Sequence, residues 1–150
     1  MLEPGTPAPD FELQNQDGDP VSLPGTGTAV VYFYPRADTP GCTTEACSFR
    51  DRWEEYEDRD VRVFGISDDP VRDLWAFQQK YDLPVTLLSD EDGTVATAYD
   101  SYGEKNMFGN TFDGVFRNTY VVRDGEVVLA YEGVDPEDHA DEILAALDDL

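Results

Sequence analysis

The feature that most constrains the fold of this chain is an apolar run from Ala29 to Tyr34, which Pro35 ends. The run holds two valines, two tyrosines and a phenylalanine in succession, without the polar alternation of a half-exposed strand. Such a run is typical of a strand that is buried on both faces of a sheet. We therefore expect this strand in the middle of a sheet that other elements cover on both sides.

The segments after this run alternate between helix and strand patterns. Thr39 and Pro40 form the pair of an N-cap residue followed by proline at the first helical position, which predicts a helix that runs towards Arg59. The other elements predicted here are strands over 61–66 and 86–88 and a helix over 71–81. Alternation of this kind indicates an α/β fold.

Both ends of the chain carry hairpin signals. Near the N-terminus, apolar and polar residues alternate on either side of a Gln-Asp-Gly-Asp turn, which predicts a hairpin over 11–23. Near the C-terminus, Asp124-Gly125 is a two-residue turn signal between strands predicted over 115–122 and 126–131. A final amphipathic helix is predicted over 137–150. The sequence therefore predicts a central mixed sheet flanked by helices, with an N-terminal hairpin.

The composition bounds the organisation of the chain and its partners. A length of 150 residues with 40% hydrophobic content is enough for one core, so residues 1–150 are predicted to form one domain. The formal charge of -23 repels nucleic acid and anionic membrane surfaces, and neither is expected as a partner. The same charge favours a halophilic source, because high salt screens the self-repulsion of a compact chain. An ordinary acidic protein with a solvated surface is the alternative.

The expected location is the cytoplasm. No apolar core with basic flanks lies between Met1 and Asp10, so no secretory signal is expected there, and no stretch has the pattern of a membrane span. In the cytoplasm two cysteines are more often catalytic or redox-active than structural.

Cys42 lies in the first turn of the helix predicted after Pro35. The start of a helix presents free N–H groups and the positive end of the helix dipole, which stabilise a negatively charged sulfur. An ordinary cysteine thiol is mostly protonated at neutral pH. The position of Cys42 therefore predicts a reactive thiolate.

Four segments in and beyond this region carry a family resemblance. They are YFYP at 32–35, DTPGCTTEACSFRD at 38–51, YGEK at 102–105 and GVFRNT at 114–119. The first two together hold a Pro-x-x-x-Thr-x-x-Cys pattern, and the chain resembles a peroxiredoxin of the Q-type branch, once named after bacterioferritin comigration. The resemblance covers nearly the whole chain. It implies a thioredoxin-like fold, a thiol peroxidase that reduces hydrogen peroxide and organic hydroperoxides, and no cofactor or metal.

The resemblance also implies roles for individual residues. Cys42 would be the peroxidatic cysteine, which attacks one peroxide oxygen and becomes a sulfenic acid. Thr39 would hydrogen-bond the bound peroxide, and Arg117 would hold the thiolate and the polarised oxygens with its fork of donors. Pro35 would shield the sulfur from water. Glu45, one helical turn beyond the cysteine, would orient Arg117.

Cys47 matches the resolving cysteine of many Q-type members, which attacks the sulfenic acid to form an intramolecular disulfide. Residues five apart in a regular helix have Cα atoms about 8–9 Å apart, beyond the roughly 7 Å limit for a disulfide. We therefore predict that the helix start, from about Thr39 to Phe49, unwinds in each cycle. A thioredoxin-like dithiol protein is the reductant that the resemblance implies. A monomer is expected, and a dimer remains open.

Simpler roles stay open for several of these residues. Cys47 is near Phe49 in the helix and would fill the core if it were not a resolving thiol. Thr39 would serve as a helix N-cap alone, and Arg117 would pair with a surface carboxylate. His139, the sole histidine, is predicted to be a surface residue.

Two other functions compete with peroxide reduction. A thiol–disulfide oxidoreductase on the same fold would act on protein disulfides, although it favours two residues between its cysteines and this chain has four. A copper-binding chaperone would use both cysteines and a distant histidine as ligands. Peroxide consumption separates the first from a peroxidase, and copper titration tests the second.

Overall fold

The computed structural model describes residues 1–150, except for the side chain of Met107. Its main sheet has the strand order β2-β1-β5-β4-β3-β8-β9 and is mixed, because β3 pairs in parallel with β4 and antiparallel with β8. The strands are β1 (Glu12–Asn15), β2 (Pro20–Ser22), β3 (Thr28–Phe33), β4 (Val61–Ser67), β5 (Thr86–Ser89), β8 (Thr119–Arg123) and β9 (Glu126–Tyr131). The mixed sheet and the N-terminal hairpin, β1 with β2, are confirmed.

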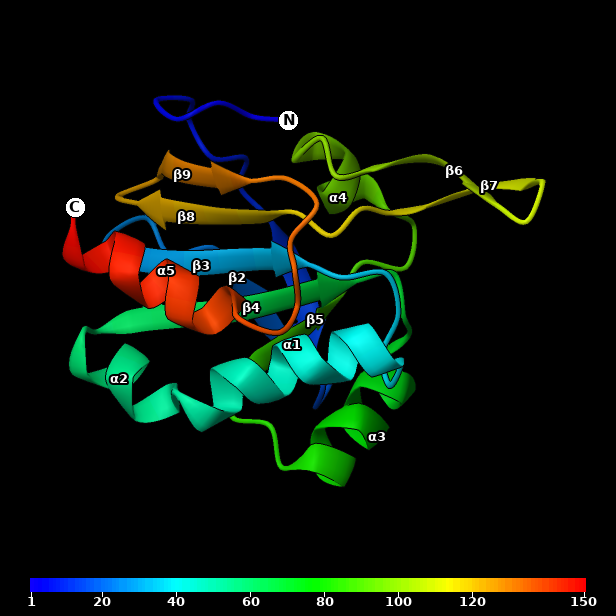
Figure 1. The fold of residues 1–150 in the computed structure, drawn as a ribbon, viewed down its shortest axis with the longest axis horizontal. Helices are drawn as coiled ribbons and strands as arrows, with labels where there is room; N and C mark the ends of the chain where they lie inside the picture. Colours follow the sequence, from blue (N-terminus) through cyan, green and yellow to red (C-terminus); the bar gives the residue numbers. More distant parts are fainter.

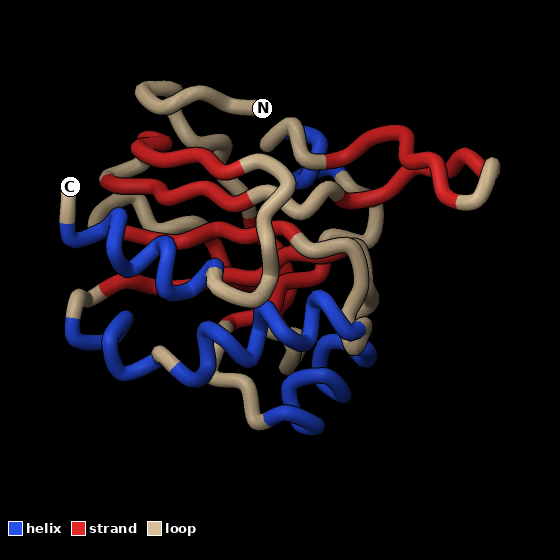
Figure 2. Tube along the Cα trace, viewed as in Figure 1, coloured by secondary structure: helices blue, strands red, loops and turns tan.

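Five helices accompany this sheet in the described chain (Figures 1 and 2). They are α1 (Pro40–Asp51), α2 (Trp53–Asp58), α3 (Val71–Tyr81), α4 (Thr94–Ala98) and α5 (His139–Asp148). One core cluster joins α1, α2, α3 and α5 to one face of the sheet, and a second cluster joins α4 and the N-terminal segment to the other face. None of the described helices is long and apolar enough to cross a bilayer.

Strand β3 lies in the interior of the sheet and is buried on both faces, as its apolar run predicts. Val30 and Tyr32 belong to the core cluster under α1, whereas Val31 and Phe33 belong to the cluster on the opposite face. This alternation follows from the two-residue period of a strand. The pairing of β3 ends just before Pro35, so the chain leaves the sheet at the edge where α1 begins.

The predicted helix from Thr39 to Arg59 is two helices. Helix α1 ends at Asp51 and α2 begins at Trp53, because the backbone of Arg52 leaves the helical region. The break turns Tyr56 into the core, where its hydroxyl donates a hydrogen bond of 2.7 Å to the carbonyl of Ala140. The prediction of one helix running towards Arg59 is therefore wrong beyond Asp51.

The strand predicted over 115–122 is also divided. Its first residue ends β7 (Asn110–Val115), which pairs with β6 (Tyr102–Met107) in a separate two-stranded sheet, and its last residues belong to β8. The hairpin of β6 and β7 extends away from the rest of the chain (Figure 1). The three residues between β7 and β8 are therefore a link between two sheets.

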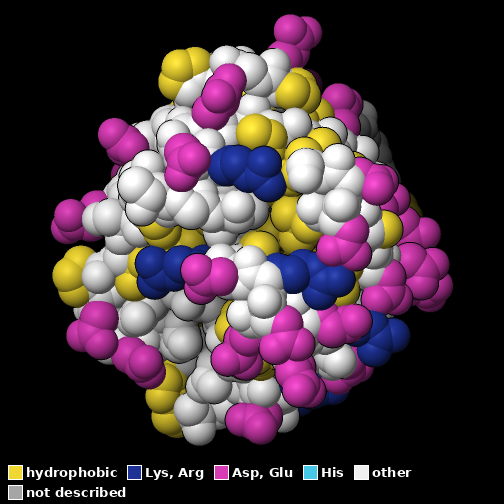
Figure 3. Space-filling model, turned by 90° about the vertical axis from the view of Figure 1, so that its left-hand side faces the viewer, with side chains coloured by type: hydrophobic (Ala, Val, Ile, Leu, Met, Phe, Trp, Pro, Cys, Tyr) yellow, Lys and Arg dark blue, Asp and Glu magenta, His cyan; other side chains and the backbone are white. Residues whose placement is uncertain are grey.

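The surface carries the excess of acidic residues. Figure 3 shows the side that lies on the left in Figure 1, where Asp and Glu side chains are spread over the face and Lys and Arg gather mainly across its middle. The formal net charge of the whole chain is -23.

Candidate active site

Cys42 lies in the first turn of α1 and is buried, with 1% of its surface exposed. The residue before the helix, Thr39, has an extended backbone, and its carbonyl accepts the first helical hydrogen bond from Thr43 at 2.8 Å. No side chain caps this helix start in the described chain. The free backbone N–H groups of the first turn are therefore not used by a side-chain cap, and they are available to stabilise a negative charge at or beside the sulfur.

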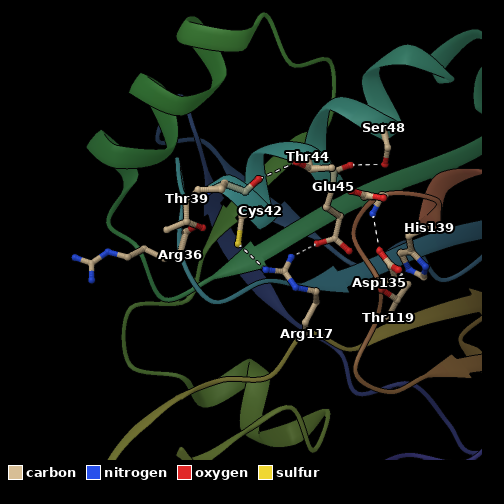
Figure 4. A network of polar contacts seen from close by, with 12 residues as sticks. Arg36, Thr39, Cys42, Thr44, Glu45, Ser48, Arg117, Thr119, Asp135 and His139 are labelled. Carbon is tan, nitrogen blue, oxygen red and sulfur yellow. Dashed lines mark hydrogen bonds and ion pairs between the residues drawn. The ribbon is translucent and has the colours of Figure 1, made fainter. Parts of the chain in front are cut away.

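Arg117 joins the sulfur to a buried carboxylate (Figure 4). Its Nη2 donates to Sγ of Cys42 at 3.2 Å, and its Nη1 donates to Oε1 of Glu45 at 2.9 Å. Arg117 comes from the link between β7 and β8, whereas Cys42 and Glu45 come from α1, so the fold brings together residues 75 positions apart. The guanidinium is fixed in one orientation by two partners and faces the sulfur with a donor.

Glu45 is fully buried, and burial raises its pKa to about 7, although Arg117 acts in the opposite direction. Its Oε1 accepts from Arg117, and its Oε2 has no hydrogen-bond partner among the described residues. A carboxyl group in this environment holds a proton over part of the neutral range.

Thr39 occupies the N-cap position but does not cap the helix. Its hydroxyl instead donates to the carbonyl of Arg36 at 2.9 Å. The lone pairs of Oγ1 remain available to accept a hydrogen bond. Capping alone therefore does not account for Thr39.

A pocket of about 500 Å³ has Arg117 in its wall, whereas Cys42, Thr39 and Glu45 do not line it. Pro35 and Arg117 line it, together with Lys105 of β6 and Phe116 of the link. Arg117 connects the pocket to the sulfur, because it lines the pocket and donates a hydrogen bond to Sγ of Cys42. Neither Lys105 nor Phe116 was predicted to be a site residue, although Lys105 lies in the YGEK segment and Phe116 in the GVFRNT segment that carry the family resemblance.

Cys47 lies on the same helix in a different environment. It is partly buried, and burial raises the pKa of its thiol, with Arg50 acting in the opposite direction. Both cysteines are free thiols in this structure. In a regular helix their Cα atoms are about 8–9 Å apart, so a disulfide requires α1 to change shape.

His139 is buried, so the prediction of a surface residue is wrong. Its ring packs edge-on against Phe49 and Tyr131, with 1% of the residue exposed. Nε2 lies 2.8 Å from Oγ1 of Thr119, and Nδ1 lies 3.3 Å from Oε1 of Glu142. Both ring nitrogens have partners, which weakens the copper-binding alternative.

Comparison with known proteins agrees with this fold and this site. The AhpC/TSA family matches residues 4–130, and the chain belongs to that family. Its members include the peroxiredoxins, whose thioredoxin-like architecture is the one described above.

The similar sequences and structures narrow the assignment. Peroxiredoxin Bcp of Escherichia coli is 41% identical over 146 residues, covering 95% of this chain and 94% of the relative. Peroxiredoxin Bcp of Bacillus subtilis is 38% identical over 152 residues, covering 99% and 97%. The crystal structure of BcpB from Mycobacterium tuberculosis superposes with a TM-score of 0.88 at 36% identity, covering 100% of this chain and 99% of that one. A PrxQ cysteine variant from Xylella fastidiosa gives a TM-score of 0.92 at 28% identity, covering 99% and 97%.

Within its family the chain is a peroxiredoxin of the Bcp, or Q-type, group, and hence a thiol-dependent peroxidase. Such an enzyme uses a peroxide as its oxidising substrate and a thioredoxin-like dithiol as its reductant.

Proposed function

We propose that Cys42 is the peroxidatic cysteine, and the donor from Arg117 to its sulfur is the observation that carries this assignment. The thiolate attacks one oxygen of the peroxide, the S–O bond forms, and the O–O bond breaks. Sulfur supplies the electron pair and becomes a sulfenic acid. The leaving oxygen takes a proton and departs as water or an alcohol.

The surrounding residues stabilise the charge that moves during this step. Arg117 offers its donors first to the thiolate and then to the oxygens that become negative. Oγ1 of Thr39 accepts a hydrogen bond from the peroxide O–H, while its own O–H continues to donate to the carbonyl of Arg36. Glu45 is a positioning residue that fixes the guanidinium, and Pro35 forms a wall that limits water.

Cys47 is proposed to resolve the sulfenic acid. Its thiolate attacks the sulfur of Cys42, and the S–S bond forms as the S–O bond of the sulfenic acid breaks. The departing hydroxide takes a proton and leaves as water. The disulfide between Cys42 and Cys47 is then reduced by two electrons from a thioredoxin-like dithiol. Because α1 holds the two cysteines apart, its start must unwind for this step.

The test is the intact mass of the reduced protein after one equivalent of hydrogen peroxide, for the parent chain and for Cys47→Ser and Cys42→Ser variants. We expect a loss of two hydrogens in the parent and a trapped sulfenic acid in Cys47→Ser. Cys42→Ser should show neither product. Oxidation of Cys47 in the Cys42→Ser variant at the parent rate would reverse the assignment. Slow peroxide oxidation with rapid reduction of protein disulfides would favour the thiol–disulfide oxidoreductase.

Organic hydroperoxides are proposed as substrates beside hydrogen peroxide. The pocket of about 500 Å³ is far larger than the roughly 30 Å³ that a water molecule occupies in the liquid. A structure of the similar Xanthomonas campestris bacterioferritin comigratory protein, 34% identical with a TM-score of 0.87, addresses its alkyl peroxide reduction activity. The superposition covers 93% of this chain and 90% of the Xanthomonas campestris chain.

We also propose a monomer from a salt-rich cytoplasm. The support is the charge of -23, which opposes both self-association and compact folding in dilute buffer. The expected result is a higher thermal midpoint in molar KCl than in dilute buffer, with a monomer mass by sedimentation. An unchanged midpoint argues against the halophilic source, and a dimer mass argues against the monomer.

A further inference from the structure

Lys105 is a cation that the acidic surface leaves without a partner. The chain has 33 acidic residues against ten Lys and Arg, and its other lysine, Lys80, lies 2.9 Å from a carboxylate oxygen of Asp38. Among the described residues, no carboxylate oxygen is within ion-pair distance of Nζ of Lys105. Three arginines of the described chain, Arg36, Arg62 and Arg123, also lack an ion pair, but all three are exposed. Lys105 differs from them because it is partly buried.

The place of Lys105 is beside the proposed peroxide site. It is partly buried, it lines the pocket with Pro35 and Arg117, and its Nζ lies 5.9 Å from the ring centroid of Phe116. Burial lowers the pKa of Lys105, and Arg117 acts in the same direction, while Cys42 and Asp68 oppose them. The ammonium group is therefore a cation that an added negative charge would stabilise.

The rest of the pocket wall leaves that charge free for a ligand. Phe116 and Pro35 supply apolar surface. Of the two acidic residues in the wall, Asp100 pairs with the amino group of Met1, and Glu132 is exposed. The pocket thus combines an apolar wall, an unpaired ammonium group and, at Arg117, a connection to the reactive sulfur. Ligand pockets typically have this composition of apolar walls with a few placed polar groups.

We propose that Lys105 binds the carboxylate of an anionic organic hydroperoxide whose apolar part rests on Phe116 and whose peroxide group reaches Cys42 beside Arg117. Lys105 takes no part in bond formation, and the chemical step is the one given above. The inference rests on the proposed function and adds to it a substrate class, carboxylated hydroperoxides, and a residue that selects them. In a chain of charge -23, such a local cation offsets the general repulsion of an anionic substrate.

The experiment compares two substrates that differ in charge and by one ester methyl group, 4-carboxycumene hydroperoxide and its methyl ester. The value of kcat/KM is measured for each with the parent chain, Lys105→Gln and Lys105→Arg, at one fixed KCl concentration. Arg123→Gln is the control, because it removes one positive charge from an exposed position where β8 pairs with Thr28, at the start of β3 and away from the site.

We expect the acid-to-ester ratio of kcat/KM to fall about tenfold in Lys105→Gln, as for the loss of one charge-assisted hydrogen bond, through a higher KM for the acid. Lys105→Arg should keep most of the ratio, and Arg123→Gln should leave it unchanged. Lys105→Met, which keeps an apolar stem over Phe116, serves as the second variant if Lys105→Gln does not fold.

Two outcomes overturn the inference. The first is an acid-to-ester ratio that is the same in the parent and in the Lys105 variants. The second is an equal loss for the acid, the ester and hydrogen peroxide, which would mean that Lys105 acts on the reactive centre. Failure of the proposed function looks different, because the parent chain would then fail to turn over hydrogen peroxide at all.

Discussion

Replacement of His139 by glutamine should remove a large dependence of stability on pH. Burial lowers the pKa of His139 from 6.5 to about 4, and the positive charge of Arg117 acts in the same direction. Between these two values the unfolded chain binds a proton that the folded chain does not. The histidine therefore stabilises the fold fully above pH 6.5, and this contribution is lost as the pH falls towards 4.

The size of the effect follows from the shift. Two and a half pKa units correspond to about 3 kcal/mol of unfolding free energy between pH 8 and pH 4. Glutamine does not titrate, and its amide supplies a neutral donor and acceptor in place of the ring nitrogen that contacts Thr119. The free energy of unfolding of His139→Gln minus that of the parent should therefore rise by about 3 kcal/mol as the pH falls from 8 to 4.

The assay is urea unfolding of both proteins at pH 8, 6 and 4 in the same concentration of KCl. Taking the difference between variant and parent cancels the contributions of the many surface carboxylates, which the two proteins share. The ring can also be followed directly by NMR, since the chain has one histidine. A difference that stays constant with pH, or a ring that titrates near 6.5, would refute the reasoning.

Three further changes test the proposed site. Arg117→Lys loses the two donors that contact Glu45 and Cys42. Its second-order rate constant with hydrogen peroxide, measured by stopped-flow fluorescence, should fall about 10²–10³-fold. A rate constant within twofold of the parent would remove Arg117 from the mechanism. Thr39→Val should lose roughly tenfold or more in the same assay while Thr39→Ser keeps most of the rate, and equal rates would leave the hydroxyl without a role. Burial raises the pKa of Glu45 to about 7 in the folded chain, from 4.5. Between these two pH values the folded chain holds a proton that the unfolded chain has lost. The carboxyl group therefore destabilises the fold as the pH rises. Glu45→Gln should therefore gain about 2–3 kcal/mol relative to the parent between pH 5 and pH 8 in urea unfolding, and no gain would contradict the burial argument.

The elements that local pattern determines could be predicted from the sequence. The apolar run before Pro35 gives an interior strand, and Thr39 with Pro40 gives a helix start, because burial on two faces and the fixed backbone angle of a proline at the first helical position depend on adjacent residues. The position of Cys42 in the first helical turn follows from these two elements. This part of the site is local, and it was predicted correctly.

The features that depend on remote packing could not be predicted in this way. His139 is polar and opens a helix, which favours the surface, but Phe49 and Tyr131 from other elements cover it. The residues around Phe116 look like part of one strand, because an apolar run does not show which strand is its partner. The structure divides that run between two sheets, and the link between them carries Arg117 to the sulfur of Cys42.

The proposed catalytic cycle places opposite demands on α1. Before oxidation the helix must hold Cys42 against its donors, and afterwards it must release the residue so that Cys47 can reach it. Unwinding the first two turns moves Glu45 from a site where burial disfavours its charge, which lowers the cost of opening at neutral pH. Extending the opening to Phe49 would expose a fully buried aromatic ring, at a cost of about 2–3 kcal/mol. The balance of these terms favours an opening that stops before Phe49, so the hydrophobic anchor of α1 stays in the core while the reactive turn changes shape.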